Sequence, residues 1–310
     1  MAERSGIGHR WSVLPPAPGS PVEADGFYHG RNPSTAERMA IYAEEAPKLS
    51  LSAIEALRAK TPLEGITHLV VASCTGFVAP GIDQIIAREL GLPGDVERTL
   101  VGFMGCYAAV SALRTAYHIV RSEPGARVLA VTVELSTLHL QFDEALEPLL
   151  AMLQFGDGAA AMLVTGEPGG FEIERPFAAT LPNSGDLIRW NVGDNGFVMQ
   201  LSGEVPGRIA EALREPGFRA ELLEESGASD AWAVHAGGRS VLDAVEQGLG
   251  LPAQALAASR DVLARFGNMS SSTLPFVLAE LLEQPEHKRG VALAFGPGLA
   301  AEGFRFRRAP

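Results

Sequence analysis

Short apolar runs alternate with amphipathic segments along most of this chain. The runs fall at residues 68–73, 127–134 and 159–165 and are rich in Val, Leu and Ala. Unbroken runs of this length are typical of strands covered on both faces, as parallel strands are. Residues 81–91 form a helical pattern that stops at a glycine, and apolar side chains recur at helical spacing from Ala109 to Val120. The pattern predicts an α/β architecture with a covered sheet.

The first part of the chain has a different pattern. Residues 12–35 are rich in Pro, Gly, Ser and charged side chains, which predicts an extended segment wrapped over the body of the protein. A long amphipathic pattern follows, and Ser34 or Thr35 is placed to cap the start of its helix. We expect Pro47 to kink or interrupt that helix.

The pattern changes again around residues 166–170. Two alternating segments, residues 171–182 and 187–203, predict a meander at this junction. We therefore expect an N-terminal half over residues 1–168 and a C-terminal half over residues 169–310. The second half returns to an α/β pattern. Its expected elements are a strand over 231–235, a helix from Ser240, a helix over 258–267, a helix from Ser270 to Leu282, a strand over 290–296 and a closing hairpin strand over 303–308.

Composition and charge narrow the possible functions. The 310 residues are 46% hydrophobic, which is ample for a large core, and the formal net charge of -12 disfavours binding to nucleic acid. Neither a secretory leader pattern nor an apolar run near the roughly 18 residues of a membrane span is present, so we expect a cytoplasmic protein without membrane insertion. The seven histidines and two cysteines show no metal-ligand spacing, so we expect free thiols and no bound metal.

Cys106 is one of the two cysteines, and it stands at the start of an amphipathic run behind Gly102 and Gly105. At the first turn of a helix, unpaired N–H groups and the positive end of the dipole favour a thiolate and can hold an oxyanion. The alternative is a small buried side chain that fills space between helix and sheet. Position alone leaves both interpretations open.

Two further polar residues stand where chemistry is possible. His235 ends an apolar strand and precedes a Gly-rich turn, and Ser240 with Asp243 resembles a capping box for the next helix. Asn268 lies between a helix closed by Gly267 and a new helix. A satisfied structural histidine and a capping asparagine are the alternatives.

Two glycine motifs carry less weight. Residues 156–161 fit G-x-G-x-x-A, but they precede a strand instead of following one, so a dinucleotide site is disfavoured. Residues 295–299, with Gly296 and Gly298, are either an ordinary hairpin turn or the wall of a pocket. The order Cys, His, Asn also occurs in papain-like proteases, but the surrounding sequence lacks their local signature.

Eight motifs in order along the chain give a resemblance to a known family. The chain resembles the type III polyketide synthases, the chalcone and stilbene synthase superfamily, in their bacterial form. The motifs that carry this resemblance are CTGFVAPGIDQ, ERTLVGFMGCYAA, RVLAVTVEL, FGDGAAAMLV, GDNGFVMQLSGEVP, WAVHAGGRSVLDAVE, RFGNMSSST and ALAFGPGLAAEGF.

The resemblance implies a thiolase fold, with two related α/β halves in a five-layered body that forms a homodimer. It assigns the catalytic triad to Cys106, His235 and Asn268. One of two gatekeeper phenylalanines corresponds to Phe155, and the other is replaced by Met199. The further pocket residues that it implies are Cys74, Thr75, Glu134, Gly237, Gly238, Ser270, Gly296, Pro297 and Gly298.

Two departures from the family bear on function. Cys74 and Ala79 stand where plant members carry Thr and a dimer-crossing Met, and together with Met199 they suggest a roomier cavity for a fatty acyl starter. Family members also carry a further segment before the one that resembles residues 3–15. Either the recorded start is too late, or the N-terminal half is incomplete and CoA affinity and activity are impaired.

The implied reaction begins when Cys106 takes an acyl group from acyl-CoA. Malonyl-CoA then loses CO₂ to give an enolate, stabilised by His235 and Asn268, which attacks the acyl-cysteine. Repeated condensations and cyclisation give a pyrone, resorcinol or phloroglucinol-type ring, and no cofactor beyond the CoA substrates is expected. The alternatives are a ketoacyl-ACP synthase III-like single condensation, a truncated non-catalytic paralogue and a cysteine hydrolase.

Overall fold

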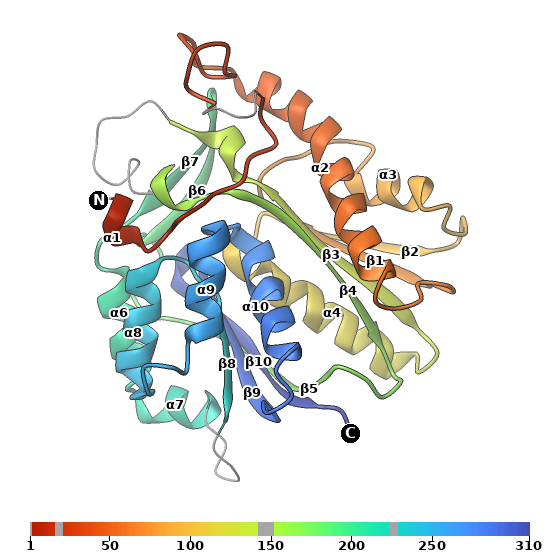
Figure 1. Ribbon diagram of the computed structural model, residues 1–310, viewed down its shortest axis with the longest axis vertical. Helices are drawn as coiled ribbons and strands as arrows, with labels where there is room; N and C mark the ends of the chain where they lie inside the picture. The colour runs from red at the N-terminus through yellow and green to blue at the C-terminus, as the bar shows by residue number, and fades with distance from the viewer. Residues whose placement is uncertain (1, 16–20, 142–151, 223–228) are drawn as a thin grey trace.

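The apolar runs form the strands of two sheets, one in each half of the chain (Figure 1). The computed structural model describes residues 2–15, 21–141, 152–222 and 229–310. The N-terminal sheet has the order β2-β1-β3-β4, the C-terminal sheet has the order β5-β10-β9-β8, and β6 pairs with β7 alone. Within the described part, no helix combines the length and the apolar character needed to span a bilayer.

The elements up to β4 are α1 (Ala2–Ser5), α2 (Thr35–Arg58), β1 (His68–Ser73), α3 (Ile82–Glu89), β2 (Glu97–Gly102), the 3₁₀ turn η1 (Gly105–Tyr107), α4 (Ala108–Ser122), β3 (Arg127–Leu135), the 3₁₀ turn η2 (Ser136–His139) and β4 (Asp157–Thr165). The remaining elements are β5 (Phe171–Thr180), β6 (Ile188–Gly193), β7 (Gly196–Leu201), α6 (Val205–Ala212), α7 (Pro216–Leu222), β8 (Ala231–Val234), α8 (Arg239–Leu249), α9 (Ala257–Phe266), η3 (Ser270–Ser272), α10 (Thr273–Leu282), β9 (Arg289–Gly296), η4 (Pro297–Leu299) and β10 (Ala300–Arg308). The proposed boundary near residue 168 falls between β4 and β5.

Strand direction follows the prediction in part. β1 lies between β2 and β3 and is parallel to both, as the unbroken apolar runs predict. β4, however, is antiparallel to β3, because an apolar run reports burial of both faces and not the direction of the chain. β2 was not predicted as a strand, because its first four residues are exposed at the edge of the sheet and break the apolar pattern.

Helix α2 begins where the sequence predicts. The Ser34 side chain accepts from the backbone N–H of Glu37, and the Glu37 carboxylate accepts from the backbone N–H of Ser34, which completes a capping box. The expected interruption at Pro47 is wrong, because the helix continues through this buried proline to Arg58. Packing of α2 against the sheet therefore outweighs the missing backbone hydrogen bond.

Three other expectations are corrected. The predicted meander is wrong, because β5 pairs with β10 while β6 and β7 form a separate hairpin. Alternation identifies a half-buried strand without identifying its partner. The Ser240 capping box is also absent, since α8 begins at Arg239 after Gly238, which supplies no side-chain cap. The helix expected from Ser270 begins as the turn η3 and becomes α-helical at Thr273.

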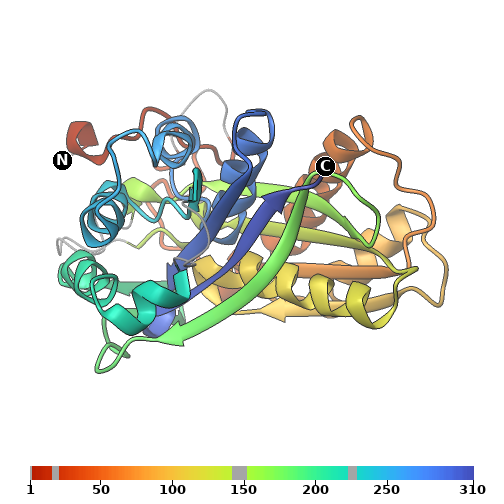
Figure 2. The same ribbon diagram turned by 90° about the horizontal axis from the view of Figure 1, so that it is seen from below.

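Five layers of helices and sheets result, with the two sheets on either side of a central helical layer (Figure 2). α2 and α3 cover the outer face of the N-terminal sheet, and α6 and α8 cover the outer face of the C-terminal sheet. The central helices α4 and α10 are apolar on more than one side. Ala112 of α4 packs on the first sheet, while Leu113 packs among residues of the second. This arrangement is the thiolase-like α/β architecture that the resemblance implies.

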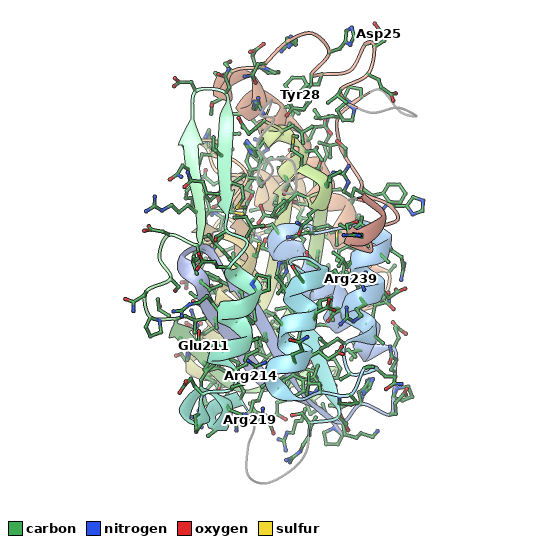
Figure 3. The ribbon with its side chains drawn as sticks, turned by 90° about the vertical axis from the view of Figure 1, so that its left-hand side faces the viewer. Asp25, Tyr28, Glu211, Arg214, Arg219 and Arg239 are labelled. Carbon is green, nitrogen blue, oxygen red and sulfur yellow. The ribbon has the colours of Figure 1, made fainter. Side chains whose placement is uncertain are left out.

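The extended segment before α2 is tied down by one buried arginine. Arg38 donates to the backbone oxygens of Pro33 and Leu138, and its guanidinium lies over the ring of Tyr28 at 5.1 Å. Figure 3 shows Tyr28 near one end of the molecule and Arg219, on α7, near the other. The described residues between 12 and 33 lack helices and strands, as predicted, and residues 16–20 lie outside the described part.

Two turns from opposite halves meet with almost no space between them. Gly105 has a φ of +74°, and a Cβ built on it would lie 2.4 Å from Cδ of Pro297. A Cβ on Gly296 would lie 2.6 Å from Cδ1 of Tyr107. Contacts this short exclude any side chain, so glycine at both positions sets how closely the two halves approach.

We predict that Gly105→Ala lowers the free energy of unfolding by about 1 to 3 kcal/mol more than Gly91→Ala does. Both substitutions meet the cost of a positive φ, but Gly91 at +64° has no neighbour within 4 Å, so the difference isolates the contact with Pro297. Urea denaturation of the two variants measures it. Equal losses would show that the turns can separate without cost.

Candidate active site

The turn η1 places Cys106 immediately before α4, at the junction of the two halves. The chain leaves β2 at Gly102 and passes through Phe103, whose φ of +56° is unusual for a residue with a side chain. Gly105 and Cys106 then begin the 3₁₀ turn that leads into the helix. The predicted position of the sulfur at a helix start is therefore confirmed.

A pocket with about 340 Å³ of space, part of it open to solvent, lies beside Cys106. Predicted site residues that line it are Cys74, Thr75, Cys106, Phe155, Met199, Ser270 and Pro297. Gly105, Ser136, Ile188 and Trp190 also line it and were not predicted. Trp190 faces Met199 across the β6–β7 hairpin and donates from Nε1 to the Cys74 oxygen at 2.8 Å. The alternation of apolar and polar residues in this hairpin was the sequence signal that could have identified Trp190.

Asn268 is held against both halves by its backbone and its side chain. Its N–H donates to the Gln154 oxygen at 2.8 Å, and its own oxygen accepts from the Gly156 N–H at 3.0 Å. The side-chain Oδ1 accepts from the Ser270 N–H at 2.8 Å, while Nδ2 donates to the Gly237 oxygen at 3.1 Å. Asn268 can therefore cap the turn and also take part in the site, because one of the two N–H groups of its amide remains available to donate to Cys106.

His235 follows β8 and is 1% exposed. Its backbone N–H donates to Leu293, but neither ring nitrogen has a hydrogen-bond partner among the described residues. A buried polar atom without a partner is costly, which makes the ring a candidate for a functional role. No hydrogen bond joins it to Cys106 in the described structure. Desolvation by burial lowers the pKa of His235 to about 3, so the ring is neutral.

Three consecutive buried serines of η3 connect the halves. The Ser270 hydroxyl lies 3.3 Å from Sγ of Cys74 and donates to Sγ of Cys106 at 3.7 Å. Ser271 donates to Oε1 of Glu134. Ser272 donates to the Gly158 oxygen at 3.0 Å. Each hydroxyl therefore finds its partner across the junction, which fixes the register of the Asn268 loop over the first sheet.

Glu134 lies behind the pocket wall and is fully buried. Its Oε2 accepts from the Cys74 N–H at 3.0 Å, the Cys74 thiol at 3.3 Å and the Thr75 hydroxyl at 2.9 Å. Desolvation nevertheless raises the pKa of this carboxyl to about 7, against the opposing effect of these hydrogen bonds. Glu134 thus supports the pocket wall and can change its protonation near neutral pH.

The predicted thiolate at Cys106 requires a correction. Desolvation raises the pKa of the thiol to about 12, although the side chains of Ser270 and Asn268 lower it. Burial therefore outweighs the helix start, and the isolated sulfur is protonated. Desolvation opposes a lone charge on Cys106 or on His235, but moving a proton from the sulfur to the imidazole would create two opposite charges that stabilise each other.

The remaining predicted residues form the turns around this junction. Gly237 adjoins the His235 ring, since a Cβ on it would lie 3.5 Å from Nε2. A Cβ on Gly238 would lie 2.4 Å from Oε1 of Gln154, so the turn packs closely on the first half. Gly296 and Gly298 flank Pro297 in η4, and the Gly298 oxygen accepts from Ser184 Oγ at 3.0 Å.

Comparisons with known proteins agree on one family. The family model described as "Chalcone and stilbene synthases, N-terminal domain" matches residues 25–168, and its C-terminal counterpart matches residues 172–310. A relative in Mycobacterium tuberculosis, "Alpha-pyrone synthesis polyketide synthase-like Pks18", is 36% identical over 304 residues, covering 92% of this chain and 77% of the relative. "Type III polyketide synthase C" of Arabidopsis thaliana is 34% identical and covers 79% of this chain and 68% of the relative.

Solved structures give the same result. The type III polyketide synthase domain of Steely1 from Dictyostelium superposes with a TM-score of 0.91 at 28% identity, covering 100% of this chain and 88% of that one. The 1,3,6,8-tetrahydroxynaphthalene synthase of Streptomyces coelicolor superposes with a TM-score of 0.89 at 26% identity, with the same two coverages.

We expect the reactivity of Cys106 to depend on His235. At neutral pH, His235→Gln should slow alkylation of Cys106 by iodoacetamide more than about tenfold, because the thiol then has no base to accept its proton. Peptide mass spectrometry over a series of pH values follows the adduct, and buried Cys74 serves as the internal control. An unchanged rate at Cys106 would mean that the imidazole does not activate the sulfur.

Glu134 should make stability depend on pH. Because its folded pKa of about 7 lies above the ordinary 4.5, its contribution is complete below pH 4.5 and is lost as the pH rises through 7. The free energy of unfolding should therefore fall by about 3 kcal/mol between these values relative to Glu134→Gln. Denaturant titrations across this range measure the difference, which cancels contributions shared by both proteins. Parallel pH curves for the two proteins would refute the raised pKa.

Proposed function

This chain belongs to the chalcone and stilbene synthase family, the type III polyketide synthases, and on that basis we propose that it condenses malonyl-CoA repeatedly onto an acyl group carried by Cys106. Members of the family are acyltransferases. The single observation that supports our assignment most is the junction itself, where Ser270 of the Asn268 loop donates to Sγ of Cys106 and the buried His235 ring has no hydrogen-bond partner among the described residues.

Acyl loading uses Cys106 and His235. The imidazole takes the thiol proton, the sulfur attacks the carbonyl carbon of an acyl-CoA thioester, and the CoA thiolate leaves with a proton from His235. The new bond is a thioester to Cys106. Because both groups are neutral at rest, the charges form as a pair and disappear when CoA departs.

Chain extension uses Asn268 and His235. When malonyl-CoA loses CO₂, the electron pair of the breaking C–C bond moves onto the thioester oxygen of an enolate. The free N–H of the Asn268 amide and a ring N–H of His235 stabilise this oxygen. The enolate carbon then attacks the acyl-cysteine carbonyl, which forms a C–C bond and releases the Cys106 thiolate. As proposed, the reaction uses no metal or redox cofactor, since CoA thioesters are its substrates.

The pocket walls set the choice of starter. Phe155 and Met199 both line the pocket, and Met199 supplies a flexible thioether where the family has a second aromatic ring. Together with Cys74 and Ala79, which are small, this favours a fatty acyl starter. We propose cyclisation to a pyrone or resorcinol-type ring, and the name of the mycobacterial relative, which refers to alpha-pyrone synthesis, supports the pyrone.

We also propose a cytoplasmic homodimer. β2 is an edge strand, Leu100 on it is 47% exposed, and Phe77 nearby is 50% exposed. An open edge with apolar side chains is a surface that a second copy can cover by strand pairing. Both cysteines are free thiols, which suits a reducing compartment.

The experiment that tests the proposal combines malonyl-CoA with a panel of fatty and aromatic acyl-CoAs. We expect long-chain starters to load and to give pyrone products by mass spectrometry. Cys106→Ala should abolish the acyl adduct because no nucleophile remains, whereas Cys74→Ser should retain it. Asn268→Ala should load normally but lose malonyl decarboxylation, since its loss costs the enolate a hydrogen-bond donor.

A specific result would contradict each of these expectations. An adduct that survives on Cys106→Ala removes the role of this sulfur, and normal CO₂ release by Asn268→Ala removes the role of the amide. If malonyl-ACP replaces malonyl-CoA and one condensation occurs, the protein acts like a ketoacyl-ACP synthase III. Free acid without malonyl-dependent product would indicate a hydrolase.

A further inference from the structure

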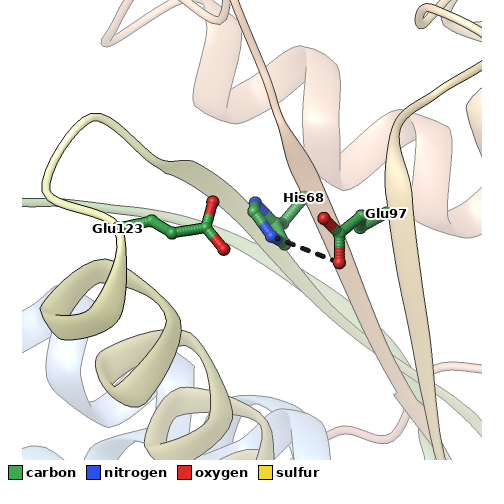
Figure 4. Close-up of side chains that lie close together, drawn as sticks. All are labelled: His68, Glu97 and Glu123. Carbon is green, nitrogen blue, oxygen red and sulfur yellow. Dashed lines mark ion pairs between the residues drawn. The ribbon is translucent and has the colours of Figure 1, made fainter.

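Three side chains from separate elements converge at the end of α4 that is remote from Cys106. His68 begins β1, Glu97 is its register partner at the start of β2, and Glu123 follows the last residue of α4. Their potential ligand atoms all lie within 4.8 Å of one another, and Figure 4 shows both carboxylates directed towards the imidazole. We propose that this group binds one Zn²⁺ ion.

A contact with Thr67 orients the His68 ring. Thr67 Oγ1 accepts from the Arg127 N–H at 3.0 Å and lies 2.8 Å from Nδ1 of His68. Because Thr67 lies on the Nδ1 side, Nε2 is the ring nitrogen that faces Glu97. A hydrogen bond on the other ring nitrogen is also what orients metal-binding histidines.

The His68 side chain is 7% exposed, and Nε2 lies 3.8 Å from Oε2 of Glu97, which is beyond a hydrogen bond. Nε2 thus faces a carboxylate across a gap. The buried imidazole is therefore directed at a position where a metal ion would satisfy both groups.

The charges around these three side chains also favour a bound cation. Among the described residues, neither Glu97 nor Glu123 forms an ion pair with a lysine or arginine. Glu123 is also the C-cap residue of α4, where the negative end of the helix dipole disfavours a carboxylate. A divalent cation would compensate the two carboxylates and the helix end together.

Zinc fits these donors better than other common ions. An imidazole nitrogen is not a ligand that Ca²⁺ or Mg²⁺ prefers, whereas Zn²⁺ binds one histidine and two carboxylates at about 2.0 to 2.2 Å with water in the fourth position. Both glutamates are exposed, so their side chains can close on the ion. Zinc would join β1, β2 and α4. Sequence spacing did not predict a metal because the three ligands come from three elements.

We test the proposal on the full chain without an affinity tag. Zinc added in slight excess and then dialysed should remain at one ion per chain, and the thermal midpoint should rise by a few degrees. Glu97→Gln and Glu123→Gln should each weaken zinc binding at least tenfold, because each removes one charged ligand without changing a buried side chain. Glu286→Gln, which removes an exposed carboxylate elsewhere, is the matched control and should bind zinc normally.

Cobalt separates this site from the cysteines. Co²⁺ bound to one nitrogen and two oxygens gives visible d–d absorption without the sulfur-to-metal charge-transfer band that Cys106 or Cys74 would produce. We expect such a spectrum in Cys106→Ala and its loss when Glu97→Gln and Glu123→Gln are combined. Absence of zinc retention, equal retention by the glutamine variants, or a thiolate band as the main signal would each overturn the proposal.

Discussion

The close packing of the Cys106 turn against the Pro297 turn is the contact on which the rest of the site depends. Gly105 and Gly296 face the other half with no room for a Cβ. Because the turns touch at this distance, the Asn268 loop can reach the segment just before β4, where its backbone bonds to Gln154 and Gly156. A larger separation would break those bonds as well as the serine contacts, so the site exists only in the fully docked arrangement.

That docking also explains the electrostatics. Desolvation at the junction raises the pKa of Cys106 and Glu134 and lowers the pKa of His235. Each group is thus held in or near its neutral form, and charge is favourable only when it forms in pairs. Strain is concentrated in the same place, since Phe103 and Ser270, both beside the site, have a positive φ. Such conformations cost about 1 to 3 kcal/mol each and persist because the docked halves impose them.

The sequence predicted the elements better than their partners. Local signals were sufficient for Ser34, for the strand before His235 and for the helix start at Cys106, because capping and apolar periodicity depend on neighbouring residues. They did not predict β2, whose exposed edge breaks the apolar pattern. They also did not predict the pairing of β5 with β10, because it joins segments that are far apart in the sequence. For the site, the family resemblance supplied residues that local signals left ambiguous. Trp190 was missed because its role depends on the hairpin that sets it opposite Met199.

Strand polarity organises both ends of the molecule. β1 and β2 are parallel, and their carboxyl ends lead to Cys74 and Cys106, while β8 in the other sheet leads to His235. Open α/β sheets bring reactive groups together at these carboxyl ends because the loops that follow the strands can vary without disturbing the sheet. The amino ends of the same strands carry His68 and Glu97 and take no part in the pocket. The proposed catalytic site and the proposed metal site therefore lie at opposite ends of α4, so each end can change without the other.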